Sequence, residues 1–246
     1  MRIPENLLSL HAAEESIREQ ALKTIAESDA LAAHLGAIHD AMNILVVFAR
    51  LDFKPASREH TLQLIGLRLL NNANSVLKLG FSGYYQTAAH LLRDKLEVAN
   101  LLDLFSVEPE KLEMWRAGDE QTIRRQFSPV EVRAALERNV KFAGQRRDGL
   151  YRVFSVYAAH PTYKSFELIS PGNTPQLGCF FSHQLLEAVL VEEARHLSHA
   201  TITLSELFGT LDEKTQSSQG GFERGLRDYF ERHIRPSTAE SARNND

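Results

Sequence analysis

The chain has 246 residues, 43% of them hydrophobic and 24% charged, which is the composition of an ordinary soluble globular protein. Its 28 Lys and Arg against 32 Asp and Glu give a net charge of −4, which argues against a globally basic nucleic-acid binder. The single cysteine, Cys179, excludes an intrachain disulfide and a multi-cysteine zinc site. The N-terminus turns acidic before a signal-peptide core develops, and the longest purely apolar run, "ILVVFA", is far shorter than the roughly 20 residues that cross a bilayer. We therefore expect a cytoplasmic protein without a membrane span.

Helical periodicity dominates the first half of the chain. Apolar residues recur every three to four positions from Ser28 or Asp29 to about residue 51, and Ser28 or Asp29 can cap that helix. A second helix is predicted from the N-cap Ser57 to Gly80, and a third over residues 84–105. No hairpin signal separates these segments.

The second half of the chain continues the helical pattern and ends in polar sequence. Ser128 with Glu131 three residues later has the spacing of a capping box. A further helix is predicted to end at Pro161, and a long amphipathic helix covers residues 180–208. The stretch 166–178 is predicted to be a loop, "TQSSQGG" a flexible joint, and "RPSTAESARNND" a disordered tail after a short helix. These features predict an all-α fold: a helical bundle over residues 1–209 with a small basic helical insertion at 107–143, followed by the joint, short helix and tail over 210–246.

Residues 116–152 are more basic than the rest of the chain. They contain nine Lys or Arg and five acids, a net charge of +4. Interleaved aromatic residues would suit a nucleic-acid surface. A solvated helical face is the more common origin of such a pattern, so we weigh nucleic-acid binding as the weaker interpretation.

The predicted helix over residues 84–105 carries a polar stripe beside a broad apolar face. With a step of about 100° per residue, six polar residues gather on one side of the helix. They are Gln86, His90, Arg93, Asp94, Glu97 and Asn100. Arg93 and Glu97 are four residues apart and can form an ion pair, either in solvent or against another helix.

Glu193 falls in the middle of the apolar face of the predicted helix over 180–208. A carboxylate buried there needs a cationic or hydrogen-bonding partner, because an unpaired buried charge is very costly. We expect Arg93 or His160 to be that partner. The same helix carries His196 and His199, which could reach one metal ion, but no third ligand is evident, so we expect no metal site.

His160 lies in the stretch "YRVFSVYAAHPTY", Tyr151 to Tyr163, directly before Pro161. Pro161 disfavours helical backbone at the preceding residue, so the helix ends there, and a protonated histidine interacts favourably with a helix C-terminus. His160 could also face a buried carboxylate. Both interpretations stay open.

Three runs of this chain resemble a family of all-helical bacterial proteins that is distantly similar to HEPN domains. They are "LGFSGYYQTAAHLLRDKLEVANLLDLF", "YRVFSVYAAHPTYKSFELISP" and "LGCFF" before the long helix, and the resemblance covers about residues 70–205. The resemblance suggests a bacterial defence or toxin setting. It also implies a helical bundle in which five side chains converge, namely Arg93, Glu97, Tyr151, Ser155 and His160.

A HEPN-type ribonuclease would carry an Arg and a His with four to six residues between them. The one match, Arg227 to His233, is no more than chance provides in a chain of this composition. We therefore expect a helical interaction or ligand-binding module that uses no cofactor, and the candidate polar cluster is Arg93, Glu97, Tyr151, Ser155, His160 and Glu193. The alternatives are a HEPN-like ribonuclease or toxin and a metal-dependent helical enzyme. The sequence also allows a homodimer.

Overall fold

The computed structural model describes residues 5–142, 147–170, 172, 174–209 and 211–234, and within these ranges the regular structure is entirely helical. The all-α prediction is therefore confirmed. The helices are α1 (Glu5–Ala26), α2 (Asp29–Ala49), α3 (Arg58–Phe81), α4 (Tyr85–Val107), α5 (Glu110–Ala117), α6 (Glu120–Gln126), α7 (Pro129–Arg138), α8 (Arg147–Phe154), η1 (Ser155–Ala159), η2 (Tyr163–Leu168), α9 (His183–Phe208), α10 (Glu213–Tyr229) and η4 (Phe230–Ile234).

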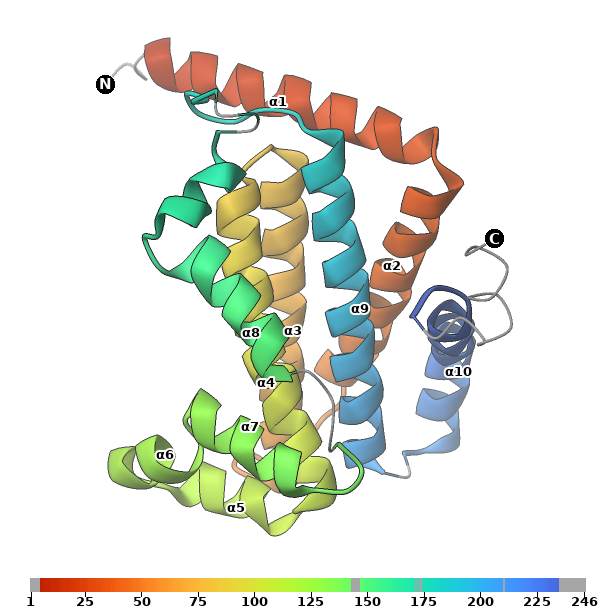
Figure 1. The fold of residues 1–246 in the computed structure, drawn as a ribbon. Coiled ribbons are helices and arrows are strands. Elements are labelled where there is room, and N and C mark those ends of the chain that lie inside the picture. Colours follow the sequence, from red (N-terminus) through yellow and green to blue (C-terminus); the bar gives the residue numbers. More distant parts are fainter. Residues whose placement is uncertain (1–4, 143–146, 171, 173, 210, 235–246) are drawn as a thin grey trace, which may run out of the picture.

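Four long helices form the centre of the bundle. Figure 1 shows α3, α4 and α9 upright beside one another, with α2 on the far side of α9 and α1 lying across one end. The central helix α9 packs against α2, α3 and α4. The apolar faces of these four helices meet in one continuous core, which buries Phe48, Leu69, Leu102 and Leu197.

Several predicted helix ends are confirmed. The Ser28 side chain accepts a hydrogen bond from the Leu31 amide, and the Ser57 side chain accepts one from the His60 amide, as expected of N-caps. Ser128 also occupies the N-cap position of α7, but its side chain makes no capping bond. Local sequence therefore sets these boundaries, although the capping box at Ser128 is not formed.

Two segments differ from the sequence-based expectation. Helix α1 was not predicted, because its first half contributes nothing to the core, and only Ala21 and Ile25 are buried. The flexible joint predicted at "TQSSQGG" is wrong: this stretch lies inside α10, which Asp212 caps and which packs along α2. Leu226 and Tyr229 of α10 are buried, so tertiary packing overrides the two glycines at 220 and 221. The predicted tail at 235–246 lies outside the described residues.

Helices α5, α6 and α7 form the predicted insertion, a separate group of short helices at one end of the bundle (Figure 1). The insertion packs on α4 through α7. Its anchors are apolar: Leu112, Phe127 and Leu136 are buried. This docking creates the largest cavity discussed below.

Helix α2 is, within the described part of the chain, the one helix long and apolar enough by length and composition to cross a membrane. In this fold its buried face includes Ile38, Ile44 and Phe48 and packs against α3, α9 and α10. The core accounts for that apolar face.

Candidate functional site

Arg93 on α4 is the centre of a polar cluster that joins α4 to α8 and to η1. Its Nε donates to Ser155 Oγ at 3.2 Å, and its guanidinium donates to the Tyr151 hydroxyl and lies 4.7 Å from the centre of that ring. One turn further along α4, Glu97 forms an ion pair with Arg93 at 3.0 Å. We call Arg93, Glu97, Tyr151 and Ser155 the Arg93 cluster. The structure brings these four predicted residues together.

Tyr151 also connects the cluster to the insertion. The Arg133 guanidinium of α7 lies 3.8 Å from the centre of the Tyr151 ring, and Arg133 is itself buried. A guanidinium over an aromatic face gains cation–π attraction, which is stronger where water is excluded. Tyr151 therefore fixes the position of α7 relative to α4 and α8.

Ser155 begins a π-helical turn, η1, in which the His160 amide donates to the Ser155 carbonyl at 3.0 Å. The extra residue in such a turn changes the direction of the helix, and π-helical turns occur frequently at functional sites. His160 then adopts extended backbone before Pro161, as predicted for the helix end. Its side chain is exposed and, among the described residues, makes no hydrogen bond or ion pair, so His160 does not belong to the cluster.

Glu193 is completely buried, as predicted, but its partner was wrongly predicted. Neither Arg93 nor His160 contacts it; instead the Lys95 ammonium of α4 donates to Glu193 Oε1, and both side chains have 0% exposure. Burial raises the pKa of Glu193 and lowers the pKa of Lys95, and the attraction between the two groups opposes both changes. Glu193 Oε2 has no hydrogen-bond partner among the described residues.

The sequence did contain the signal for Lys95. On a helical wheel Lys95 lies in line with Ala88, Leu92, Ala99 and Leu102, all of which are buried. A lysine in an apolar stripe of α4 and a glutamate in an apolar stripe of α9 are natural partners where those two faces meet. Lys95 was assigned to neither face of this helix, and the pair was missed for that reason.

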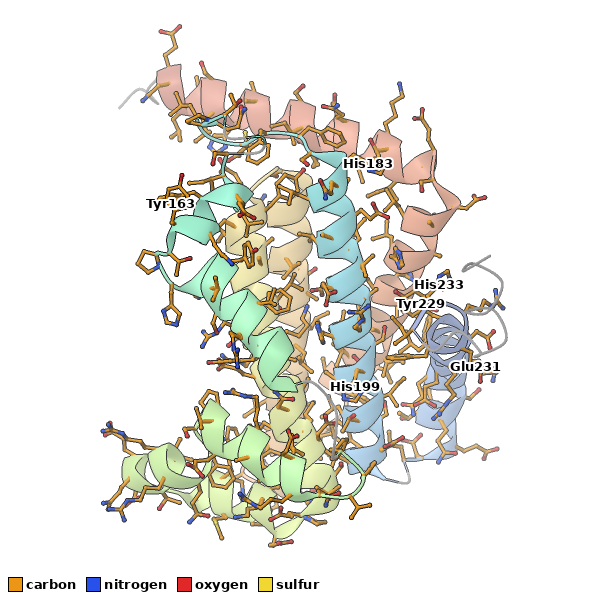
Figure 2. All side chains as sticks on the ribbon, viewed as in Figure 1. Tyr163, His183, His199, Tyr229, Glu231 and His233 are labelled. Carbon is orange, nitrogen blue, oxygen red and sulfur yellow. The ribbon has the colours of Figure 1, made fainter. Side chains whose placement is uncertain are left out.

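His196 and His199 of α9 have separate partners. His196 Nε2 lies 3.0 Å from Glu192 Oε2, whereas His199, labelled in Figure 2, lies 3.0 Å from both carboxylate oxygens of the buried Asp103 on α4. Burial would raise the pKa of Glu192, but the hydrogen bond from His196 and the charges of His196 and Arg195 bring it below its ordinary value. Within the described ranges, no group of three or more His, Cys, Asp or Glu side chains is arranged to hold a metal ion.

His233 belongs to a small cluster at the C-terminal end of α10. Its ring stacks on Tyr229 with centroids 5.0 Å apart (Figure 2), and Tyr229 hydrogen-bonds His34 of α2 at 2.8 Å. Burial lowers the pKa of His34, and the nearby His233 adds to the effect. Arg227, by contrast, lines a cavity between α9 and α10. Arg227 and His233, the one match to the ribonuclease spacing, therefore contact different helices.

A cavity of about 520 Å³, which we call the insertion cavity, lies where the insertion docks on α3 and α4. Most of its lining is apolar. The apolar lining residues are Leu64, Ile65, Val98, Leu101, Trp115, Ile123, Phe127, Pro129 and Val132. Its volume is in the range of small-molecule sites.

Polar groups occupy the part of the insertion cavity formed by α3 and α4. Arg68 of α3 pairs with Asp94 of α4 at 2.5 Å, and Asn72 donates to Asp94 at 3.3 Å. Glu97 of the Arg93 cluster is also part of the lining. The sequence placed Asp94 and Glu97 on one stripe but could not show that the insertion would enclose them in a cavity.

A scan against protein-family models, a search of curated proteins and a search of solved structures each gave no match. The resemblance to HEPN-like bacterial proteins therefore stays a prediction.

Proposed function

We propose that this chain is a helical ligand-binding module whose ligand binds in the insertion cavity. The observation that carries the proposal is an apolar cavity of about 520 Å³ with a few convergent polar groups at one side. Leu64 remains 51% exposed at this cavity, and Trp115 and Ile123 are half-buried. A ligand that covers these side chains would gain the free energy of apolar burial.

The charges of the lining favour a ligand with a cationic end. Arg68, Asp94 and Glu97 give the lining a net charge of −1, because the partner of Glu97, Arg93, is not part of the lining. The aromatic faces of Trp115 and Phe127 also attract cations. We therefore infer that the ligand is a largely apolar molecule with one amine.

Binding is better supported than catalysis at this cavity. Among the described residues, the lining contains no Ser, Cys, His or Lys, and its one hydroxyl belongs to Thr61. A nucleophile paired with a general base would need such groups within hydrogen-bond reach. The carboxylates Asp94 and Glu97 are each held in an ion pair.

Intrinsic fluorescence offers a direct test, because Trp115 is the only tryptophan of the sequence and lies in the lining. Titration with octylamine should change the Trp115 emission saturably, and octanoate, which has the same chain length and the opposite charge, should bind more weakly. Leu64→Phe should weaken octylamine binding by partly filling the cavity. Leu8→Phe is the matched control, because Leu8 is 53% exposed on α1 and does not line the cavity. No saturable change with either probe, or equal weakening by both variants, would contradict the proposal.

A further inference from the structure

A second cavity, of about 320 Å³, lies between α9 and α10 and differs in chemistry from the insertion cavity. We call it the α9–α10 cavity. In Figure 1 α10 and the insertion lie on opposite sides of α9. The lining is predominantly polar and includes Ser205, Glu206, Gln219, Glu223 and Arg227. We propose that the α9–α10 cavity binds a small zwitterion that carries an ammonium and a carboxylate group, such as a free amino acid.

The first argument is an unsatisfied buried amide. Gln219 is only 8% exposed, and its Nε2 donates to Glu223 Oε1 at 3.1 Å, which fixes the orientation of the amide. Its Oε1 is buried and has no donor among the described residues. A buried acceptor without a donor is costly, so a native site of this kind normally receives a hydrogen bond from water or a ligand.

A second lining residue, on the other helix, also has a buried oxygen without a partner. Ser205 Oγ of α9 is also buried and has no hydrogen-bond partner in the described part of the chain. An ammonium group has three donors, and it could serve Gln219 Oε1 and Ser205 Oγ together. The carboxylates of Glu206 and Glu223 in the same lining would compensate its charge.

Arg227 supplies the complementary half of the site. It lines the cavity one turn beyond Glu223 on α10 and, within the described ranges, forms no ion pair. A guanidinium binds a carboxylate through two parallel hydrogen bonds. The lining therefore offers acceptors for an ammonium group and a cation for a carboxylate. Glu206, Glu223 and Arg227 give it a net charge of −1, which disfavours binding of a purely anionic ligand.

The test uses the full chain and a panel of free L-amino acids at millimolar concentration, with ethanolamine and acetate as probes that each carry one half of the zwitterion. At least one amino acid should raise the melting temperature and bind in calorimetry, and it should bind more tightly than either half. Gln219→Leu and Arg227→Met should each weaken binding by about tenfold or more. Arg224→Met is the matched control, because Arg224 is exposed on the same helix and does not line the cavity.

Three results would overturn the proposal. If no amino acid shifts the melting temperature or gives a binding heat, the cavity holds water only. If an amino acid binds with equal affinity to wild type, Gln219→Leu and Arg227→Met, its site is elsewhere. If ethanolamine binds as tightly as the amino acid, and Arg227→Met does not weaken binding of the amino acid, the cavity binds an amine and does not recognise the carboxylate. Because Gln219→Leu could disturb folding, Ser205→Ala provides a smaller change in the same cavity, and circular dichroism verifies that each variant is folded.

Discussion

Replacing one member of the buried Lys95–Glu193 pair should destabilise the protein far more than replacing both. In Lys95→Met the Glu193 carboxylate would be left at 0% exposure without a cation, and breaking a buried pair in this way costs about 3–5 kcal/mol. For a chain of this length, that corresponds to a fall in melting temperature of roughly 6–20 °C. The double variant Lys95→Met/Glu193→Leu removes both charges and keeps similar volumes.

The double variant should be close to the wild type in stability. A buried ion pair offsets its desolvation only when further hydrogen bonds satisfy the remaining polar atoms, and Glu193 Oε2 has none among the described residues. We therefore expect an unfolding free energy within about 1 kcal/mol of wild type, or higher. Urea unfolding followed by circular dichroism measures all variants, and Glu27→Gln is the control for an exposed pair, because Glu27 is 67% exposed beside Lys23.

The pH dependence should distinguish the two single variants. Burial raises the pKa of Glu193, so in Lys95→Met the folded state binds the extra proton and the loss of stability should shrink on acidification from neutral pH. Burial lowers the pKa of Lys95, so in Glu193→Leu the loss should shrink as the pH rises toward the ordinary lysine value. Each change is limited to about 1.4 kcal/mol per pH unit. A loss below about 1 kcal/mol in Lys95→Met, or a double variant as unstable as the sum of the single variants, would refute this reasoning.

Three further predictions test other parts of the fold. Gly83→Ala should lower the unfolding free energy by at least about 2 kcal/mol, because Gly83 has φ +80° and a Cβ there would lie 2.3 Å from a backbone oxygen. Gly36→Ala on α2 is the control, since Gly36 has open space around it, and it should be neutral or stabilising in the same urea unfolding assay. Burial lowers the pKa of His34 in the folded state, so the stability that His34 contributes is present above its ordinary pKa and is lost as the pH falls through the folded value. His34→Gln should therefore make the unfolding free energy less sensitive to acid. An unchanged dependence of the unfolding free energy on pH would contradict this. The purified protein should leave single-stranded RNA intact, because Arg227 and His233 contact different helices, and His233→Ala should behave in the same way. Cleavage by the wild type that is lost in His233→Ala would support the ribonuclease alternative.

The parts of the fold that local chemistry decides were predictable from the sequence. Ser28 and Ser57 cap their helices because the capping bond lies within one turn, and Pro161 ends a helix through its own ring geometry. The burial of Glu193 was predictable for a related reason, since the position on a helical wheel depends only on the helix itself.

Features that depend on how distant segments pack were not predictable in the same way. The insertion cavity exists only because Trp115, Ile123 and Val132 dock beside α3 and α4, and no local pattern reports that docking. Likewise, α10 forms across a stretch whose glycines favour a flexible joint, because Leu226 and Tyr229 gain burial against α2. Local preference was outweighed there by tertiary packing.

Two of the ion pairs of α4, Arg93–Glu97 and Lys95–Glu193, separate ligand binding from stability, because their exposure differs. Glu97 and Arg93 have side-chain exposures of 29% and 21%, so Glu97 can turn from Arg93 toward an amine in the insertion cavity, whereas Glu193 is at 0% and has only Lys95. Glu97→Gln should therefore reduce the preference for octylamine over octanoate while it changes the unfolding free energy by less than about 1 kcal/mol. Glu193→Leu should lower the unfolding free energy strongly and leave the preference for octylamine over octanoate unchanged. Fluorescence titration and urea unfolding of both variants measure the two effects, and a Glu97→Gln variant that keeps the amine preference would show that the cavity does not select its ligand through Glu97.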